Sequence, residues 1–267
     1  MSHASTLDQF ALSKVQTSSG AVFQPSSQAA AQLNAQQDVF KVVASLSATP
    51  QWGSFADWNL QPNDFSILND VICKIDVSSI SGITGGPASF VADGTFLIQR
   101  VEVSIQDKIV DVIYPEAMYA RDLTENINEV KSRFMALSKN ATLATRKTYG
   151  ASAQSFYIQI PSFWTVQPGF FVRALNAPIK IRVVLANLGD VVQVNGGTGT
   201  ASCTVNSVSL IASGKEFANQ ATALQQLASY RKVPQILFRY LTPVQMSKQS
   251  LVAGSTTYVV FIKQFGP

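Results

Sequence analysis

Residues 96–137 read FLIQRVEVSIQDKIVDVIYPEAMYARDLTENINEVKSRFMAL, and they combine two strand patterns, a turn and a helical pattern. Within Leu97–Gln106, one face of an extended chain carries Val101, Val103 and Ile105. The other face is polar, and this period of two predicts a half-buried strand. Nothing in the stretch is typical of a catalytic site, so it predicts architecture rather than chemistry.

The second half of this stretch predicts a hairpin that leads into a helix. Asp107 and Lys108 form the expected turn, and Ile109–Ile113 is the second strand, with Asp111 as its only polar residue. Pro115 cannot donate a hydrogen bond within a sheet but suits the first turn of a helix. An apolar stripe at helical spacing follows at Leu123, Ile127, Val130, Phe134 and Leu137.

Composition favours a protein that buries much of its surface. Charged residues make up only 13% of the 267 residues, whereas 46% are hydrophobic and the mean hydropathy is positive. Low charge is common in subunits of assemblies, although large enzymes share it. The net charge of +4 is too small to indicate nucleic-acid binding. One basic cluster is interpreted as a solvated face, and it comprises Lys131, Arg133, Lys139, Arg146 and Lys147.

The two cysteines and the chain start bear on the compartment. Cys73 and Cys203 form no C-x-x-C or metal-ligand pattern, so we interpret each as a small buried apolar residue. The sequence leaves a disulfide between them open. The first residues lack the basic and apolar regions of a signal peptide, and no apolar run is long enough to span a membrane. We therefore expect synthesis in the cytosol and no insertion into a membrane.

The order of elements along the chain predicts the fold class. Residues 1–38 are rich in Ser, Ala and Gln and predict a flexible N-terminal arm. Asn140–Gly150 and Gly82–Gly86 are expected to be connections, and a capping box at Ser213–Glu216 predicts a second helix. Further strand patterns occur at Val39–Leu46, Asn69–Ile80, Ser155–Ile160, Ile179–Leu185, Cys203–Ile211, Ile236–Leu241 and Thr257–Lys263. Without a βαβ rhythm, they predict an all-β, antiparallel jelly-roll sandwich with helices inserted in its loops.

Aromatic residues gather in two segments. Trp52, Phe55 and Trp58 lie in a segment bounded by Pro and Asn, where they suit either anchoring of a loop on the core or a platform for sugars. Pro168-Gly169 is a turn dipeptide flanked by Phe163, Trp164, Phe170 and Phe171. Asn195–Gly199 lacks the setting of a phosphate-binding loop and is expected to be a hairpin tip.

The sequence offers little for catalysis. Its only histidine, His3, lies in the arm, so catalytic triads and histidine metal sites have no candidate. Two acid pairs are conceivable, Asp107 with Asp111 and Asp122 with Glu125. Turn and helix N-terminal positions explain all four acids without function. We therefore predict no catalytic, cofactor-binding or metal-binding residues and no enzymatic activity.

Four segments together carry a resemblance to a known family: Asn63–Val77, Ile98–Ile113, Tyr157–Val183 and Ile236–Lys263. In order and spacing they resemble the major capsid proteins of the double jelly-roll viral lineage. The likeness is to large eukaryotic DNA viruses and, more distantly, to tailless phages with an internal membrane. It covers residues 60–267, and one departure is Gln106-Asp107, which stands where the family usually has glycines.

The resemblance implies an arm (1–38), a first jelly roll (39–231) and an incomplete second roll (232–267), which the family continues well past Pro267. It implies a structural role in which homotrimers form pseudo-hexagonal capsomers that tile an icosahedral virion shell. The implied partners are neighbouring capsomers, minor capsid proteins and an internal viral membrane, with no cofactor and no sequence-specific nucleic acid. The protein would be made in the host cytoplasm and located in the virion. The helix would lie in a long loop, with its apolar stripe on a barrel edge or against a neighbouring subunit.

Two alternatives predict different surfaces. A carbohydrate-binding jelly-roll module requires exposed rings, for which Trp52, Trp58 and Trp164 are the candidates. A β-sandwich hydrolase requires Asp107 or Asp111 in an active site. The capsid hypothesis instead places the three tryptophans in the core or at subunit contacts.

Overall fold

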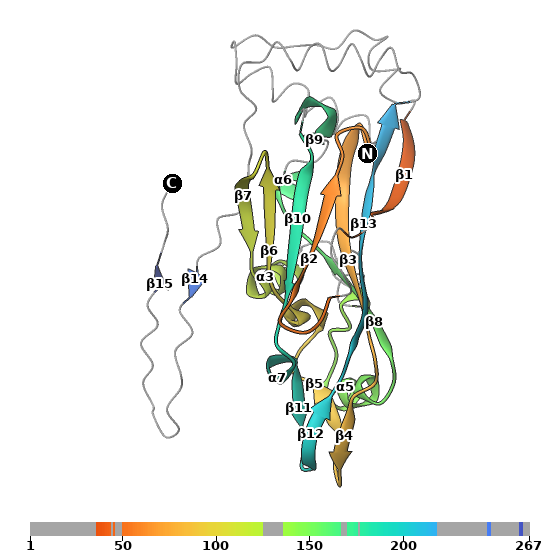
Figure 1. Ribbon diagram of the computed structural model, residues 1–267, viewed down its shortest axis with the longest axis vertical. Coiled ribbons are helices and arrows are strands. Elements are labelled where there is room, and N and C mark those ends of the chain that lie inside the picture. The colour runs from red at the N-terminus through yellow and green to blue at the C-terminus, as the bar shows by residue number, and fades with distance from the viewer. Residues whose placement is uncertain are drawn as a thin grey trace.

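Two antiparallel sheets pack face to face in this computed structural model, which describes residues 36–43, 45, 50–124, 136–166, 170–175, 177–217, 245–246 and 262–263 (Figure 1). Sheet A runs, in spatial order, through β1 (Gln36–Val43), β13 (Val205–Phe217), β3 (Ile67–Val77) and β8 (Gln154–Gln159), and the short β9 (Phe170–Phe171) also pairs with β3. Sheet B runs through β2 (Phe55–Leu60), β10 (Ile179–Leu185), β6 (Ile98–Ile105) and β7 (Lys108–Ile113).

The connections between these eight strands define the topology. In chain order, sheet A holds the first, eighth, third and sixth strands, and sheet B holds the second, seventh, fourth and fifth. Of the consecutive pairs among these eight strands, only β6 and β7 lie in the same sheet. Every other connection between them crosses from one sheet to the other. Two interlocked Greek keys of this kind make a jelly roll, which confirms the predicted fold class.

The connections at one end of the barrel carry small sheets of their own. There β4 (Ser81–Thr84) pairs with β12 (Thr198–Ser202), and β5 (Ala88–Phe90) pairs with β11 (Val192–Val194). Helix α5 (Leu143–Gly150) packs against β5 (Figure 1). We call residues 78–97 and 186–204 together with α5 the loop end. The other elements are η1 (Gly94–Leu97), α3 (Pro115–Thr124), α6 (Phe163–Val166), η2 (Val172–Leu175), α7 (Leu188–Val191) and the β14–β15 pair (Gln245–Met246, Ile262–Lys263).

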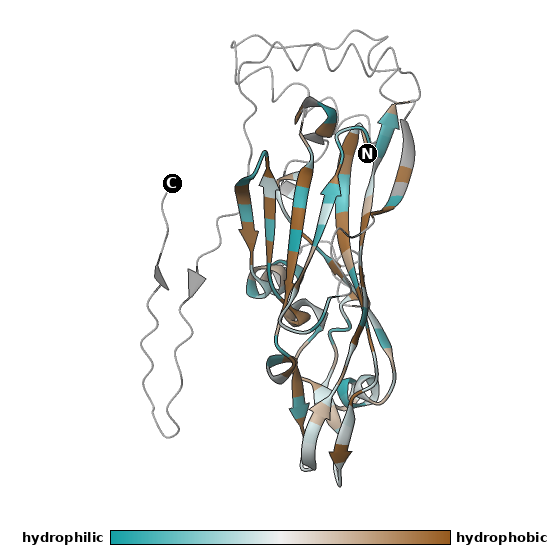
Figure 2. Cartoon of the chain, viewed as in Figure 1, coloured by the Kyte–Doolittle hydropathy of each residue, from teal (hydrophilic) through white to brown (hydrophobic). Residues whose placement is uncertain are grey.

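Alternating side chains build the core between the sheets. In β3 the predicted inward residues, Val71, Cys73, Ile75 and Val77, are all buried, and the residues between them are half-buried. The predicted alternation of β6 and β10 is confirmed in the same way, and Figure 2 shows it as bands of hydrophobic and hydrophilic colour along these strands. Helix α3 begins at Pro115, as predicted.

Two segments differ from their predicted secondary structure. Asn140–Gly150 is not simply a connection, because Leu143–Gly150 forms α5, and the Thr142 side chain caps it by accepting the N–H of Thr145. Ser213–Glu216 does not start a helix but continues β13. Strands β1 and β3 flank β13 on both sides there and take its backbone hydrogen bonds, which overrides the local capping signal.

Two segments predicted as loops contain strands, and two turns differ from their predicted positions or types. Phe55–Leu60 is strand β2, and Ser81–Thr84, which overlaps the predicted loop Gly82–Gly86, is strand β4. The turn after β6 lies at Gln106 and Asp107, which both have a positive φ, as a two-residue hairpin of type I′ requires. Asn195–Gly199 is not a hairpin tip, because β11 and β12 on either side of it pair with different strands.

Several predictions lie outside the described residues. They concern the arm before Gln36, the Pro168-Gly169 turn, the strand at Ile236–Leu241 and the stripe residues Ile127, Val130 and Phe134. Of the other two stripe residues, Leu123 lies in α3 and Leu137 is half-buried. The β14–β15 pair places a strand within a predicted connection, and β15 coincides with the end of the predicted last strand, whose earlier residues lie outside the described part of the chain. The division at residues 38 and 231 stays a prediction.

Candidate functional site

The acids singled out in the sequence do not form catalytic pairs. Asp107 is exposed in the hairpin turn, whereas Asp111 is 6% exposed and lies on the inward side of β7. Asp122 is buried near the described end of α3, and Glu125 lies outside the described residues. The expectation that turn or helix N-terminal positions explain these acids is therefore wrong for Asp111 and Asp122.

Asp111 is held by hydrogen bonds from a hydroxyl and a backbone N–H. Ser162 Oγ donates a hydrogen bond of 2.6 Å to its carboxylate, and the backbone N–H of Val112 also bonds to it. Burial raises the pKa of Asp111, and these hydrogen bonds oppose the rise. No ion pair between described residues involves Asp111. The hydrogen bond between Ser162 and Asp111 joins the segment before α6 to β7, and it is typical of a structural contact rather than an acid–base site.

A second buried acid, Asp93, caps the short helix η1 at the loop end. Asp93 caps η1 by accepting hydrogen bonds from the backbone N–H and the hydroxyl of Thr95. Burial raises the pKa of Asp93, the nearby Asp122 adds to the rise, and the Thr95 bonds and Arg146 oppose it. Arg121 pairs with Asp122 at 3.0 Å, and Arg146 donates to the backbone carbonyl of Val91. The Arg146 bond joins α5 to the chain just before η1, whereas the Arg121–Asp122 pair lies within α3.

Lys139 is not part of a solvated basic face, contrary to the prediction. Its ammonium group lies 5.0 Å from the centre of the Tyr149 ring and 5.5 Å from that of Phe156. Burial lowers the pKa of Lys139. The side chain also donates to Gln154 and so fastens the chain after α3 to the start of β8.

The tryptophans are core residues rather than a sugar platform. Trp58 and Trp164 are buried, and Trp52 is half-buried and donates its Nε1 hydrogen to the carbonyl oxygen of Cys203 over 2.7 Å. Cys73 and Cys203 are free and buried, and burial raises the pKa of Cys73 to about 12. Thiols with a raised pKa are poor nucleophiles, so the structure supports the interpretation of both as small apolar residues.

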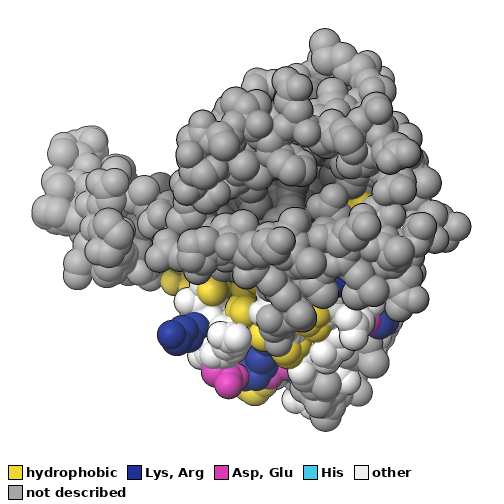
Figure 3. Space-filling view, turned by 90° about the horizontal axis from the view of Figure 1, so that it is seen from above, with side chains coloured by type: hydrophobic (Ala, Val, Ile, Leu, Met, Phe, Trp, Pro, Cys, Tyr) yellow, Lys and Arg dark blue, Asp and Glu magenta, His cyan; other side chains and the backbone are white. Residues whose placement is uncertain are grey.

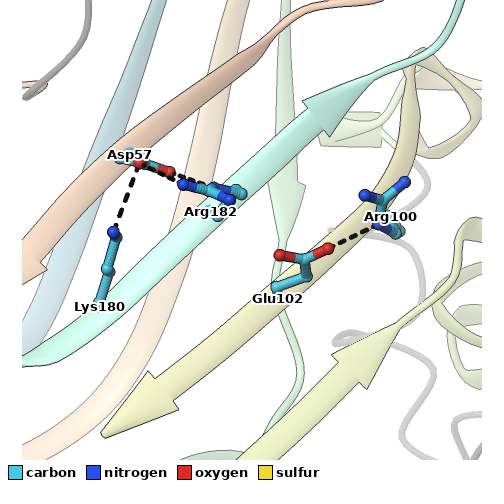
Figure 4. A network of polar contacts seen from close by, with 5 residues as sticks. All are labelled: Asp57, Arg100, Glu102, Lys180 and Arg182. Atoms are coloured by element: carbon cyan, nitrogen blue, oxygen red, sulfur yellow. Dashed lines mark hydrogen bonds and ion pairs between the residues drawn. The ribbon is translucent and has the colours of Figure 1, made fainter. Parts of the chain in front are cut away.

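The outer face of sheet B carries a line of alternating charges that crosses three strands (Figure 4). Arg182 on β10 lies opposite both Asp57 on β2 and Glu102 on β6. Its guanidinium group donates two hydrogen bonds to the Asp57 carboxylate, at 2.8 and 2.9 Å. Lys180 lies 3.6 Å from Asp57, and Arg100 pairs with Glu102 at 2.7 Å. We call these five residues the sheet B ladder.

The acidic side chains of this ladder are less exposed than the basic ones. The side chains of Asp57 and Glu102 are 12% and 19% exposed, whereas those of Arg100, Lys180 and Arg182 are 35–40% exposed. The hydrogen bond from Arg182 lowers the pKa of Asp57, against the opposing effect of desolvation. The acids therefore lie beneath the basic groups, and a partner would meet a mildly basic surface.

Sheet A presents a different outer face. Asp76 accepts hydrogen bonds from Lys74, Ser155 and Ser207, which come from three adjacent strands. Desolvation raises the pKa of Asp76, but these hydrogen bonds together bring it below its ordinary value. The charged groups of this part of the face are thus already satisfied within the subunit.

Sequence reasoning missed the sheet B ladder as a unit. The period of two in β2, with Ala56, Trp58 and Leu60 inward and Asp57 outward, is the signal that could have revealed it. The described part of the surface seen from above mixes hydrophobic, basic and acidic side chains (Figure 3). Within the described residues, no group of three or more potential ligands is placed to hold a metal ion, and no helix is long and apolar enough to cross a membrane.

Known proteins resemble this chain in structure but not detectably in sequence. No family model and no curated protein sequence matches it. The capsid of the virus PBCV-1 matches with a TM-score of 0.54 and 14% identity, over 80% of this chain and 48% of that one. The fold is that of a viral capsid jelly roll. The Faustovirus major capsid protein matches this roll with a TM-score of 0.53 and 7% identity, over 76% of this chain and 57% of that one.

These matches concern the fold of the described roll. The chain spans about half the length of the capsid proteins it matches. At identities of 14% and 7%, the likeness establishes the jelly-roll fold.

Proposed function

We propose that this chain is a structural capsid protein whose copies associate as homotrimers and build pseudo-hexagonal capsomers of an icosahedral virion shell. The single observation that carries the proposal is the structural match to the PBCV-1 capsid across 80% of the chain. The strand order of both sheets supports it, because it gives the full connectivity of a capsid-type jelly roll.

The described surface agrees with a role in assembly. Its buried acids serve hydrogen-bonded structural contacts, and its tryptophans fill the core, so neither alternative function gains a site. The low content of charged residues suits a subunit that buries much of its surface against neighbours. We propose the virion as the location, with neighbouring capsomers, minor capsid proteins and an internal membrane beneath the shell as partners, and no sequence-specific nucleic acid. We propose no enzymatic activity.

The mass of the purified protein in solution tests this proposal. Multi-angle light scattering across a concentration series should give a species three times the 28.8 kDa chain mass. Electron microscopy of the same sample should show particles with a hexagonal outline. A stable monomer at every concentration would contradict the proposal, as would turnover of a glycan or ester that Asp111→Asn abolishes.

A further inference from the structure

Strand β7 lies at one side of sheet B. Among the described strands it pairs with β6 alone, and Figure 1 shows it at the outer side of the sheet. We call the side of Lys108–Ile113 that faces away from β6 the β7 edge. Backbone N–H and C=O groups on the edge of a sheet are a template for pairing with a strand of another molecule. Association through such an edge is either used by a protein or prevented.

The composition of β7 favours pairing with another strand. Its apolar residues are all Ile or Val, and they comprise Ile109, Val110, Val112 and Ile113. Ile109 is 60% exposed, and Val110 and Val112 are half-buried. Short segments with high β-propensity and little charge are the ones that add to the edges of other sheets. Asp111, at the centre of this run, is the residue that interrupts it.

Stability alone does not explain a carboxylate at this position. The Asp111 side chain points inward and is buried, and burial raises its pKa. Burying a carboxylate costs free energy, whereas a β-branched apolar residue in the same place would pack without that cost. An inward-pointing charge on an edge strand is one of the devices by which natural sheets prevent pairing with other molecules. Proteins give up stability for such devices.

The hydrogen bonds of Asp111 bring its carboxylate to the β7 edge. The carboxylate accepts the backbone N–H of Val112, the next residue in the strand. Successive residues of an antiparallel strand direct their N–H groups alternately toward the partner strand and away from it. An N–H that a side chain of its own strand accepts is not donated to β6, so this group lies on the β7 edge. A strand added there would need the same N–H, and Asp111 already holds it.

Two further features of β7 oppose pairing at this edge. The register against β6 shifts between Val103 and Ser104, which leaves Val110 without a partner in β6. Such a bulge bends an edge strand and increases its local twist, which disturbs the register that an added strand would need. Lys108, which is exposed at the start of β7, adds a charge, as protected edge strands often do. Both features act in the same direction as Asp111.

We infer that Asp111 prevents β7 of a second copy from adding to the β7 edge. A second copy is the molecule that it excludes, because identical apolar segments pair readily with one another. Addition of a strand would remove the remaining water from the carboxylate and compete for the N–H of Val112, which would leave a buried charge with one donor fewer. The inference goes beyond the proposed function, since it concerns a contact that the unaltered chain does not make.

Replacement of the charge in the full chain tests this inference. Asp111→Val completes the apolar run of β7 and releases the N–H of Val112. Sedimentation velocity across a concentration series should show species larger than those of the unaltered chain, with self-association strengthened by about tenfold or more. Hydrogen exchange of these species should show added protection in β7 but not in β2, at the opposite edge of sheet B.

Two further variants separate edge pairing from a loss of stability. Ser162→Ala is the matched control, because it removes the hydroxyl donor of the same carboxylate and leaves Asp111 in place. It should associate like the unaltered chain. Val112→Pro, added to Asp111→Val, is the reversal, because a proline on an edge strand cannot donate an N–H to an added strand. The double variant should return to the mass of the unaltered chain.

The outcomes separate this inference from the proposed function. The inference is wrong if Asp111→Val associates no more than the unaltered chain, if Ser162→Ala associates as strongly, or if Val112→Pro does not reverse the effect. A trimer of the unaltered chain would support the capsid proposal in each case, and a stable monomer would contradict that proposal alone. Circular dichroism melting checks that each variant folds. Asp111→Thr and Ile109→Lys replace the valine and proline variants if these do not fold, with the same expected pattern.

Discussion

In the barrel body, which sheets A and B form, side chains of the two sheets pack against each other. At the loop end, backbone atoms of neighbouring strands pack directly against each other. The body is filled by alternating residues of both sheets, such as Ile75 on β3 and Ile181 on β10. At the loop end, a Cβ atom added to Gly82 would lie 2.3 Å from the carbonyl oxygen of Thr200. One region therefore depends on side-chain volume, and the other depends on the absence of side chains.

The loop end and the barrel also differ in their content of charged residues. The two connections of the loop end carry charged residues only at Asp93 and Asp190, beside η1 and within α7. Their β-ribbon strands, β4 and β12, consist of Gly, Ser, Thr, Ala and Ile. The barrel faces instead carry ion pairs and hydrogen-bonded acids. The two sheets are therefore expected to tolerate substitutions of their surface residues. The β4–β12 pair is expected to tolerate few substitutions that alter its backbone conformation.

The largest effect is expected from emptying the barrel body. Trp58→Ala removes a fully buried indole from β2 and should lower the free energy of unfolding by about 3–5 kcal/mol, because a cavity remains. Denaturant titration followed by circular dichroism measures the loss. Phe55→Ala in the same strand is the control, and it should cost less than about 1 kcal/mol because the ring points outward, is 47% exposed and stacks on Arg182. Equal losses would show that the two faces of β2 are not distinct.

A smaller and more local effect is expected at the loop end. Gly82→Ala must accommodate both a φ of +81° and the clash with Thr200, and should cost about 1–3 kcal/mol. Hydrogen exchange should show the loss of protection in β4 and β12 while β3 and β10 stay protected. Gly189→Ala is the matched control, because its Cβ would meet nothing within 4 Å, and it should be neutral or slightly stabilising. Loss of protection throughout the barrel would mean that the two regions unfold as one unit.

The buried acid of the barrel body predicts a pH dependence of unusual sign. Because the folded pKa of Asp111 is raised, its protonated form contributes stability that is present below the unfolded pKa and is lost as pH rises through the folded pKa. Asp111→Asn should remove this loss and should therefore compare more favourably with the unaltered chain at pH 7 than at pH 4.

Thermal melting at the two pH values measures this difference. Ser162→Ala is the companion variant, since it removes the hydroxyl donor of the carboxylate and should destabilise by about 1–3 kcal/mol. Its deficit should be greater at pH 7 than at pH 4, because more of the carboxyl is charged at the higher pH and a hydrogen bond to the charged form is the stronger one. If Asp111→Asn changes stability by the same amount at both pH values, the carboxyl group does not titrate as its burial implies.

The smallest effect is expected on the barrel surface. Arg182→Lys loses the two-pronged hydrogen bond to Asp57 and the stacking on Phe55, yet it should cost less than about 1 kcal/mol because the guanidinium is partly solvated. Denaturant titration at low and high salt checks this. A loss comparable to that of Trp58→Ala would show that the ladder, rather than the core, supports sheet B.

The sequence was informative where one pattern dominated. Strands with clean alternation, such as β3 and β10, and the helix start at Pro115 could be predicted because local pattern and burial agree there. The strand at β2 was hidden because its aromatic residues and flanking Pro and Asn suggested a loop. Helix α5 was missed because its eight residues carry a weak apolar pattern, and Thr142 alone marks its start.

The remaining differences depend on contacts between distant segments. The continuation of β13 through Ser213–Glu216 is set by its neighbours on both sides, which no local signal contains. Asp111 faces inward in a hairpin whose register shifts between Val103 and Ser104, so its burial also depends on pairing. The same holds for the ladder, because the sequence placed Lys180 and Arg182 on a polar face but could not place Asp57 beside them.

The pairing of β1 with β13 has an evolutionary consequence. Gln36, at the start of β1, lies directly opposite Phe217, at the end of β13, so the first and last strands of the described sandwich have adjacent ends. A unit with adjacent ends can be copied in tandem or inserted into another gene without any change to its internal path.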